Sequence, residues 1–564
     1  MLQLSRVRGA IPLRSGLAAL LAIGIASSAG TPVVAQQTPE LVIETPRSKL
    51  SEEKAPAKKP QFFVDELLIS YRSGLDIQQV IAGLKPEFEK SGQKFSNVSV
   101  VELIPGMAVL RITRTRDGTS TSTNLDDSTT RRVMQFIRGT GAVESVERNF
   151  ISNINEDRLN RLINPDEPAG SGSAPPRSGT TALQPGGAPP VQVPVAIDRS
   201  KVQSRGVFPS DPMFKYQWHL LNYGRAFTPS ALPGGTNFSA IWSKRQVRAV
   251  TIAIVDSGIV ANHPDIDKSR ILPGYDFVHA KLEVVNDGTP GPDSDPTEPP
   301  NEAIPTGKCP RGNANFHGTH VAGIAGAAKS NNGIGIAGSA WNARILPIRV
   351  MNKCGSGDIL SISIGILWAA GAPIKGLPVN KNPANIINLS LGQSGTAVGC
   401  HPFQKKAIDY AYAKGVVVVS AAGNAGNDVA MTTPASCRNV ISVAASDARG
   451  YLTNYSNFGA NIDIMAPGGA MNRDDNKDGY PDGILSLSPK GLVHKSGTSM
   501  AAPLVSAAIA NMLSINPKMT PDDVRQALRA NARPRNSKQC PRPCGAGLLD
   551  VNFSRRVPTS EVRQ

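Results

Sequence analysis

The sequence lacks several patterns that would mark other protein classes. Its 564 residues include only six cysteines, none before position 309, and no two of them form a Cys-x-x-Cys pair. Because structural zinc modules are usually built on such pairs, the cysteines do not favour a zinc protein. The 60 lysine and arginine residues give a net charge of +16, but no RNP, zinc-finger or basic-helix pattern accompanies them. The sequence therefore favours a basic globular protein with no nucleic-acid partner.

Long apolar runs are also scarce. After residue 30 we expect no stretch long and apolar enough to span a bilayer, which takes about 20 apolar residues. The shorter run at 15–30 follows three arginines and precedes the small residues Val33-Val34-Ala35, an order typical of a secretory signal peptide. An uncleaved anchor is the alternative. We expect removal of 1–35 and a protein secreted by the Sec route, passing through the periplasm and not held by a membrane afterwards.

The remaining pattern predicts two folded units with a linker between them. In 61–150 the order β-α-β-β-α-β predicts a small α+β, ferredoxin-like unit. In 207–553 buried apolar strands alternate with helical segments, which predicts an α/β unit with a doubly wound, mainly parallel sheet. Proline, glycine and serine are frequent in 151–206, as in linkers. Residues 36–60 and 554–564 are predicted to be a loose polar segment and a polar tail.

The apolar spacing also predicts individual elements. In the first unit we expect strands at 63–71, 96–103, 107–112 and 142–150, and helices at 76–90 and 128–137. In the second unit the clearest expected strands are 249–255, 344–350, 386–389, 416–420 and 440–444.

Four polar residues of the second unit stand at strand ends or helix starts. Asp256 directly follows an expected strand, and Asn424 ends another. His317 opens the small-residue segment His317-Gly318-Thr319-His320-Val321-Ala322-Gly323, and Ser499 lies in Gly497-Thr498-Ser499-Met500-Ala501-Ala502-Pro503, before a helical run. Because functional groups collect at the carboxyl ends of strands in open α/β sheets, we expect these four to meet. Together they would supply a nucleophile, a base, an orienting carboxylate and an oxyanion donor.

Each of these residues also has a purely structural interpretation. Asp256 and Asn424 are residue types common in turns, and Ser499 is a typical helix N-cap. A metal pair of His317 and His320 is conceivable, but the His-Glu-x-x-His pattern of zinc proteases is absent, and His320 is better explained as a structural histidine. Only the four residues taken together favour acyl transfer.

The three segments around Asp256, His317 and Ser499 resemble the signature blocks of subtilisin-like serine proteases, in that family's order Asp, His, Ser. The resemblance covers about 207–553 and implies a three-layer catalytic domain with a mainly parallel sheet. It implies a secreted serine endopeptidase in which Ser499 attacks the peptide carbonyl, His317 transfers the proton and Asp256 orients His317. Asn424 and the Ser499 N–H would hold the oxyanion.

The resemblance also implies a substrate cleft and partners. The segment 388–392 is similar to the edge strand on which the family lays protein and peptide substrates. Neither 390–396 nor 421–426 contains an acidic residue, so we expect broad specificity with an apolar or neutral residue before the scissile bond. We expect a monomer. The alternatives are a non-catalytic binding protein with the same fold and a dedicated processing protease that acts on one partner. The expected substrate-binding residues are Ser390, Leu391, Gly392, Ala422 and Gly423.

The unit at 61–150 resembles the propeptide that assists folding of such proteases and inhibits them until it is cut. This implies a zymogen that processes itself, with its own propeptide as an intramolecular inhibitor. The sequence departs from the family in one respect, because about 55 linker residues separate the two units. We expect 151–206 to be removed on maturation.

The six cysteines are expected to form three disulfide bonds. Six cysteines allow 15 pairings, and we expect the sequential one because each pair then closes a local loop. The expected disulfides are Cys309–Cys354, Cys400–Cys437 and Cys540–Cys544.

Calcium is the expected cofactor, bound for structural reasons. The segment 474–482 has oxygen ligands at positions 1, 3, 5 and 9 and glycine at position 6, as in an EF-hand loop, but Leu485 replaces the glutamate at position 12. A second acidic cluster is formed by Asp287, Asp293, Asp295 and Glu298 in a loop rich in proline and glycine, with Asp287, Asp293 and Asp295 as its expected ligands. A solvated loop is the alternative for both segments. The expected ligands of the first site are Asp474, Asn476, Asp478 and Asp482.

Overall fold

The computed structural model describes part of the chain. All the residues that it describes lie within Glu40–Gln564. The described residues are 43–44, 62–82, 97–116, 119–123, 127–153, 208–221, 233–242, 248–282, 291–298, 316–394, 399–489 and 491–552.

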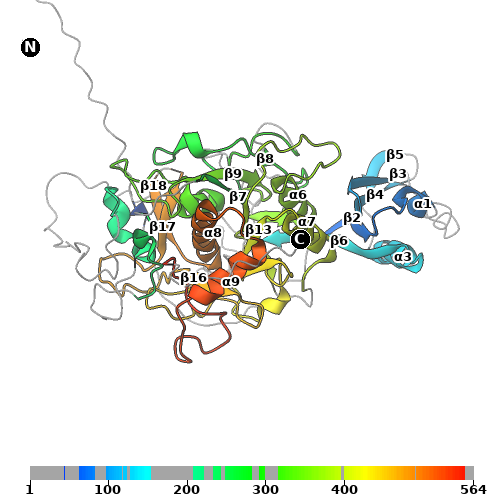
Figure 1. Ribbon diagram of the computed structural model, residues 1–564. Helices are drawn as coiled ribbons and strands as arrows, with labels where there is room; N and C mark the ends of the chain where they lie inside the picture. The colour runs from blue at the N-terminus through cyan, green and yellow to red at the C-terminus, as the bar shows by residue number, and fades with distance from the viewer. Residues whose placement is uncertain are drawn as a thin grey trace, which may run out of the picture. The chain divides into compact units, whose positions relative to one another are not determined.

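A seven-stranded sheet forms the centre of the larger folded unit (Figure 1). Every pairing between its neighbouring strands is parallel. This confirms the predicted α/β class, and each strand expected from the sequence is present. In sheet order the strands are β16 (Ile464–Pro467), β15 (Val440–Ser446), β13 (Val417–Ala421), β11 (Ile386–Leu389), β7 (Val250–Asp256), β9 (Ala343–Arg349) and β8 (Tyr275–Asp276).

Helices cover both faces of this sheet and produce three layers. Because side chains alternate along a strand, Ile252 and Ile254 of β7 pack in the core that contains α8 (Thr498–Ile515). Ala253 and Val255 pack in the core that contains α6 (Ile359–Ala369) and α7 (Pro402–Ala413). Burial on both faces explains why the strands are continuously apolar. α9 (Pro521–Asn531) follows α8 (Figure 1).

The helix α8 corrects one expectation about apolar runs. By length and composition it would suffice to cross a membrane, contrary to the prediction that no stretch after residue 30 would do so. However, 94% of it is buried inside the fold. It is therefore a buried helix that packs against the central sheet, and this packing explains its apolar character.

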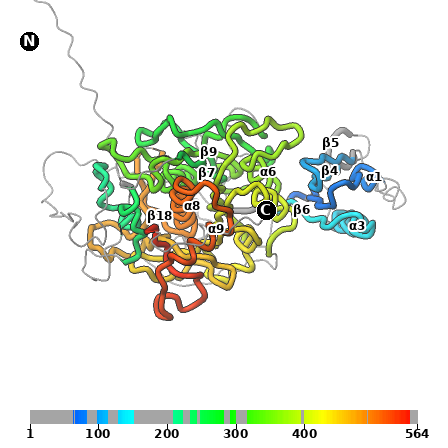
Figure 2. Tube along the Cα trace, in the orientation of Figure 1, coloured from blue at the N-terminus to red at the C-terminus, as the bar shows by residue number. Residues whose placement is uncertain are grey.

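The N-terminal α+β unit has the predicted order of elements, drawn in blue and cyan in Figures 1 and 2. Its antiparallel strands pair in the order β6-β2-β4-β3, and Leu67, Leu110 and Ile137 lie in its core. The strand β5 (Thr119–Thr123) was not predicted, and the predicted helix is described only to Ala82. The elements are β2 (Phe62–Tyr71), α1 (Ile77–Ala82), β3 (Asn97–Ile104), β4 (Met107–Arg116), α3 (Asp127–Gly139) and β6 (Val143–Asn153).

The N-terminal unit contacts the larger unit through β6. This strand pairs antiparallel with β10 (Ser356–Asp358). The Glu147 carboxylate accepts the Phe403 N–H at 2.6 Å, at the start of α7, and Asn149 Oδ1 accepts the Leu360 N–H at 3.1 Å, at the start of α6. Both helix N-termini thus receive an acceptor from the N-terminal unit, which satisfies backbone donors that helices leave unpaired.

Short elements and disulfides complete the larger unit. The hairpin of β17 (Ile484–Ser488) and β18 (Gly491–Lys495) pairs with β1 (Ile43–Glu44), and β12 (Gln393–Ser394) pairs with β14 (Thr432–Thr433). The Cys400–Cys437 and Cys540–Cys544 bonds are present, and Cys354 is also disulfide-bonded, whereas Cys309 lies outside the described residues. The short helices are η1 (Pro212–Tyr216), η2 (Trp218–Leu220), η3 (Phe238–Ala240), η4 (Lys268–Arg270), α5 (His317–Ala322), η5 (Gly323–Ala327) and η6 (Val429–Met431).

Candidate active site

A buried carboxylate–imidazole pair lies at the carboxyl end of β7. Asp256 is the last residue of β7, and His317 is the first residue of α5. His317 Nδ1 lies 2.8 Å from Asp256 Oδ1 and 3.0 Å from Oδ2, and both side chains are fully buried. Because a carboxylate accepts hydrogen bonds, this contact favours the tautomer with the proton on Nδ1. The Nε2 atom of that tautomer carries a lone pair and can accept a proton.

Gly318 explains how the two segments approach so closely. A Cβ atom at this position would lie 2.2 Å from Gly258 O and 3.2 Å from Asp256 Cβ. The Gly318 N–H also donates to Ser257 Oγ at 3.0 Å. Any side chain here would separate α5 from the turn after β7, and with it His317 from Asp256.

His320 has a structural environment, as the sequence suggested. Its Nε2 atom lies 3.1 Å from Val493 O, and burial holds its pKa well below the usual value. Among the described residues, no group of three or more histidine, cysteine, aspartate or glutamate side chains is suited to hold a metal ion. His320 is thus a buried neutral histidine that ties α5 to β18.

Ser499 is the second residue of α8 and is only 6% exposed. Its hydroxyl donates to Ser390 O at 3.1 Å, and Ser390 Oγ donates to Ser499 O at 2.8 Å. Asn388 Nδ2 donates to Ser390 Oγ at 2.9 Å. These bonds fix the start of α8 against the end of β11, where the first N–H groups of a helix are free to bind negative charge.

Asn424 lies beside the start of α8 and is almost fully buried. Its Oδ1 atom accepts the Thr498 N–H at 2.8 Å and the Thr498 hydroxyl at 2.9 Å. Because the amide oxygen is engaged in this way, its orientation is fixed and the Nδ2 group is the part that can donate to a ligand.

A narrow pocket joins Ser499 and Asn424, and its lining includes neither Asp256 nor His317 nor any charged side chain. Of the five expected substrate-binding residues, Ser390, Leu391, Gly392 and Gly423 line this pocket and Ala422 does not. Ala422 packs in a separate core, and Ala421 lines the pocket instead, because alternate residues of the chain face opposite sides here. The lining residues are Ser390, Leu391, Gly392, Ala421, Gly423, Asn424, Thr498 and Ser499.

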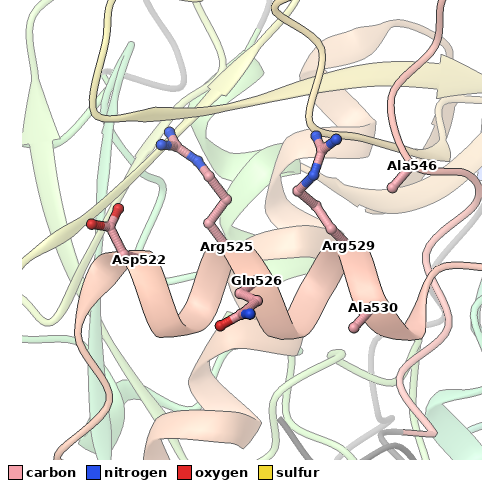
Figure 3. A pocket seen from close by; sticks show the side chains of 6 residues that line it. All are labelled: Asp522, Arg525, Gln526, Arg529, Ala530 and Ala546. Carbon is pink, nitrogen blue, oxygen red and sulfur yellow. The ribbon is translucent and has the colours of Figure 1, made fainter. Parts of the chain in front are cut away.

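A broader, open hollow of about 650 Å³ lies at α9, and Figure 3 shows two arginine side chains rising from the same side of that helix. Arg525 Nε and Arg529 Nη1 lie 3.3 and 3.5 Å from Asp463 Oδ1, so this carboxylate offsets one of their two positive charges. The hollow has no nucleophile and is lined by none of the four predicted catalytic residues. Its lining is Asp522, Arg525, Gln526, Arg529, Ala530 and Ala546.

Sequence reasoning did not find Asn457, which organises the loop that carries Asn424. Its Nδ2 atom donates to Ala422 O and Thr432 Oγ1, both at 2.8 Å. Its Oδ1 atom accepts the N–H groups of Ala425 and Asn427, both at 3.0 Å. One buried amide thus fixes both sides of Asn424. No sequence signal pointed to it, because it lies 33 residues from Asn424 in an ordinary loop.

The predicted calcium ligands at 474–482 lie in one loop, but their oxygens bind mainly the loop itself. The Asp474 carboxylate accepts the N–H groups of Asp478 and Gly479, both at 3.1 Å. Asp482 Oδ2 accepts the Asp475 N–H at 2.7 Å. Burial, joined by the charges of Asp475 and Asp474, raises the pKa of Asp482 to about 7. The described side chains of this loop form no group suited to a metal, so the site stays a prediction.

In the second acidic segment, the described aspartates Asp293 and Asp295 accept backbone N–H groups of their own loop. Asp293 Oδ1 accepts the Asp295 N–H at 2.7 Å, and Asp295 Oδ1 accepts the Thr297 N–H at 2.9 Å, as in successive Asx turns. Asp287 lies outside the described residues.

Two buried carboxylates that the sequence did not reveal, Asp211 and Asp265, flank the 331–336 loop. Asp211 accepts the Asn331 N–H at 2.8 Å and the Asn332 N–H at 3.1 Å, and Asn332 Nδ2 donates to Asp265 Oδ1 at 3.0 Å. Burial, joined by the charge of Asp211, raises the pKa of Asp265 to about 7. Carboxylate, amide and backbone oxygens are the ligands that calcium prefers. A cation here would relieve the repulsion between the two carboxylates.

The fold and site define an α/β protein with a buried carboxylate–imidazole pair at the carboxyl end of a parallel strand and a serine at a helix N-terminus. The chain belongs to the subtilase family, since the family model described as Peptidase_S8, Subtilase family, matches residues 247–547, more than half of the chain.

Similar proteins carry protease names. The chain is 34% identical over 362 residues to an extracellular protease of Xanthomonas campestris pv. campestris, covering 63% of this chain and 58% of that protein. It is 38% identical over 273 residues to thermitase of Thermoactinomyces vulgaris, covering 48% and 77%. A solved structure titled as proteases from Pseudoalteromonas arctica is 38% identical, with a TM-score of 0.53, covering 62% of this chain and 98% of that one.

The extracellular basic protease of Dichelobacter nodosus is 34% identical over 356 residues, covering 61% of this chain and 55% of that protein. The chain therefore spans little more than half the length of this protein and of the Xanthomonas protease.

Proposed function

We propose that this chain is a secreted serine endopeptidase with Asp256, His317 and Ser499 as its catalytic triad. The observation that carries the proposal is the buried contact of His317 Nδ1 with Asp256, which favours a basic Nε2 atom. Membership of the subtilase family and the protease names of similar proteins support the same reaction. The names of two extracellular relatives support secretion, and the expected signal peptide, 1–35, lies outside the described residues.

The reaction proceeds through an acyl-enzyme. The Ser499 hydroxyl leaves Ser390 O and gives its proton to His317 Nε2 while its oxygen attacks the peptide carbonyl carbon. His317 then gives this proton to the leaving amine, and the same imidazole activates the water that releases the acyl group. Asp256 keeps its charge throughout and stabilises the imidazolium. Its complete burial strengthens this interaction, because charges interact more strongly where water is excluded.

The negative charge that develops on the carbonyl oxygen is held by two donors. Asn424 Nδ2 is one, oriented by the bonds from Thr498 to its amide oxygen. The Ser499 backbone N–H at the start of α8 is the other. Donors fixed in this way need no reorganisation during the reaction, which is the main source of such stabilisation.

The narrow, uncharged pocket supports an apolar or neutral residue before the scissile bond, and hence broad action on protein and peptide substrates. The substrate backbone would extend along Ser390, Leu391 and Gly392 as an added strand. The enzyme would act as a monomer. A cleavage profile on a peptide library dominated by arginine or lysine before the scissile bond would contradict this specificity.

The unit at 61–150 would be the inhibitory propeptide. The bonds of Glu147 and Asn149 to the first turns of α7 and α6 support a docked inhibitor, because they use acceptors that fit helix N-termini. Cleavage by the enzyme itself, followed by removal of 151–206, would separate the two units. β6 continues to Asn153, so the folded unit extends three residues beyond the predicted boundary.

Calcium would serve a structural role beside Asp211 and Asp265, whose buried carboxylates both bond to the 331–336 loop, and at the 474–482 loop if its oxygens turn inward. It would neutralise carboxylate charge and stabilise the loops that bear it. It would take no part in the proton transfers.

The test compares Ser499→Ala with Ser514→Ala, which changes the same residue type in the last turn of α8. Full-length variants are expressed, and precursor size and casein hydrolysis are followed. We expect wild type and Ser514→Ala to shorten themselves and to degrade casein, and Ser499→Ala to remain full length and inactive. Normal self-cleavage by Ser499→Ala would refute the catalytic assignment and favour a binding protein with a protease fold.

A further inference from the structure

A buried glutamate links the two segments that carry the carboxylate–imidazole pair. Glu298 is 0% exposed, although the sequence placed it near an acidic loop. Its Oε2 atom accepts the Ser257 hydroxyl at 2.8 Å, and its Oε1 atom accepts the Phe316 N–H at 3.3 Å. Ser257 follows Asp256 in the chain, and Phe316 precedes His317. One carboxylate therefore bonds to the neighbours of both catalytic partners.

Phe316 has an unusual backbone conformation. Its φ and ψ angles are 46° and 39°, in the left-handed region that bulky side chains rarely adopt. It precedes α5, and no side chain caps that helix at its first position. Strain of this kind persists only where the surroundings enforce it, and it is concentrated at functional sites. The Phe316 N–H donates to Glu298, and the Phe316 carbonyl accepts the His320 N–H at 3.2 Å.

The segment that carries Glu298 is itself fixed against the turn after β7. The Ile259 N–H donates to Pro296 O at 3.2 Å. A Cβ atom at Gly258, where φ is +97°, would lie 2.5 Å from Pro296 O and 3.1 Å from the Glu298 nitrogen. Glu298 is thus held by the same turn that follows Asp256. Through its bond to the Phe316 N–H, it fixes Phe316 relative to that turn.

We propose that Glu298 is a positioning residue for the base: it holds Phe316 in the left-handed conformation and so directs His317 at Asp256. This proposal rests on the proposed peptidase function. Glu298 touches neither substrate nor reacting atoms, and it acts through the backbone on both sides of the pair.

The charges around Glu298 are compatible with this role. Burial raises its pKa to about 7, the bond from Ser257 and the charges of Arg349 and Lys495 oppose the rise, and the charge of Asp256 adds to it. Both of its hydrogen-bond partners donate, so the ionised form satisfies them better than the protonated form.

The test is a double-mutant cycle of Glu298→Ala and Phe316→Gly. Glycine adopts the left-handed conformation without strain, so it should make Glu298 less necessary. We expect Glu298→Ala to lower kcat at least tenfold with KM changed less than threefold, since displacement of a catalytic group by about 1 Å can cost about a hundredfold. In the Phe316→Gly background the same change should cost at most threefold. Equal losses in both backgrounds would refute the proposal.

Two further variants separate position from stability and charge. Asp463→Asn removes another buried carboxylate, which accepts the Ser442 N–H far from the site, and should lower thermal stability without changing kcat. Glu298→Gln keeps one acceptor oxygen but removes a negative charge near the imidazole, so we expect partial activity and an acid limb of kcat/KM moved to lower pH. A Gln variant identical to wild type in kcat and pH profile would also refute the proposal.

The active fraction of each preparation is measured by stoichiometric titration with a fluorophosphonate, and substrate kinetics are referred to it. If Glu298→Ala fails to mature, the Gln variant carries the test. Peptidase activity of Ser499→Ala at the wild-type level would overturn the proposed function. An inactive Ser499→Ala with an unaffected Glu298→Ala would overturn only the present proposal.

Discussion

Two histidines that are buried as neutral groups should weaken the fold in acid. His219 on η2 and His494 on β18 are almost fully buried. Burial, joined by the neighbouring His494, lowers the pKa of His219 from 6.5 to about 3, and burial lowers that of His494 from 6.5 to about 4. When a histidine has a lowered pKa in the folded state, the unfolded state binds more protons. Stability is therefore lost as the pH falls below about 6.5.

The size of the effect follows from these pKa values. Between pH 7.5 and 5.0 each unfolded imidazole becomes protonated while its folded counterpart remains neutral. At about 1.4 kcal/mol per pKa unit, each residue contributes about 2 kcal/mol to the loss, and the pair about 4 kcal/mol. Asp265, Asp482 and Glu298 act in the opposite direction, because their pKa values are raised to about 7 and their protonation stabilises the fold. The prediction therefore concerns the difference between a histidine variant and its parent in the unfolding free energy lost between pH 7.5 and 5.0.

The assay is urea unfolding of Ser499→Ala, which cannot digest itself, at pH 7.5 and 5.0. All four tryptophans lie between Trp218 and Trp368, so their fluorescence reports the larger unit. We expect a His219→Gln/His494→Gln double variant to lose about 4 kcal/mol less than its parent between the two pH values. The stability that is lost because the glutamines pack less well is the same at both pH values, so it cancels in this comparison. The same loss in parent and variant would refute the reasoning.

Three further predictions concern the site and the metal. Asn424→Ala should lower kcat about 10²- to 10³-fold with little change in KM, a magnitude known from subtilisin itself; a purely KM effect in steady-state kinetics would contradict its oxyanion role. Gly318→Ala should abolish peptidase activity, because its Cβ atom would lie 2.2 Å from Gly258 O. Gly376→Ala has open space around it but a φ of +83°, so it should lower stability and leave activity in place; full activity of Gly318→Ala would show that the close approach is unnecessary. Calcium should raise the thermal unfolding temperature less below pH 7 than above it, because Asp265 becomes protonated there. It should also raise that temperature less in Asp265→Asn than in the parent; equal calcium effects in the two proteins would exclude Asp265 as a ligand.

The sequence predicted the sheet, and it placed four polar residues at strand ends and helix starts, because both features depend on local signals. Buried parallel strands are continuously apolar, and Asp256, His317, Asn424 and Ser499 each stand where such a strand ends or a helix begins. The common edge of a parallel sheet then brings residues far apart in sequence into one region.

Features set by packing could not be predicted in this way. Asp211 and Asp265 meet across a loop more than 60 residues further along, and neither belongs to an acidic run. Whether Ala421 or Ala422 lines the pocket depends on which side of the chain faces α8, and the motif does not indicate it. Glu298 was predicted as a member of the acidic cluster with Asp287, Asp293 and Asp295, and its burial depends on a turn around Gly258 that only the folded chain reveals.

The most direct test of the central claim is covalent labelling of the serine. The wild type, His317→Ala and His320→Ala are treated with a fluorophosphonate, and the modified residue is identified by peptide mass spectrometry. We predict one adduct, on Ser499, formed by the wild type and by a folded His320→Ala, and slowed at least a thousandfold in His317→Ala. An adduct on another residue, or equal labelling rates with and without His317, would contradict the account.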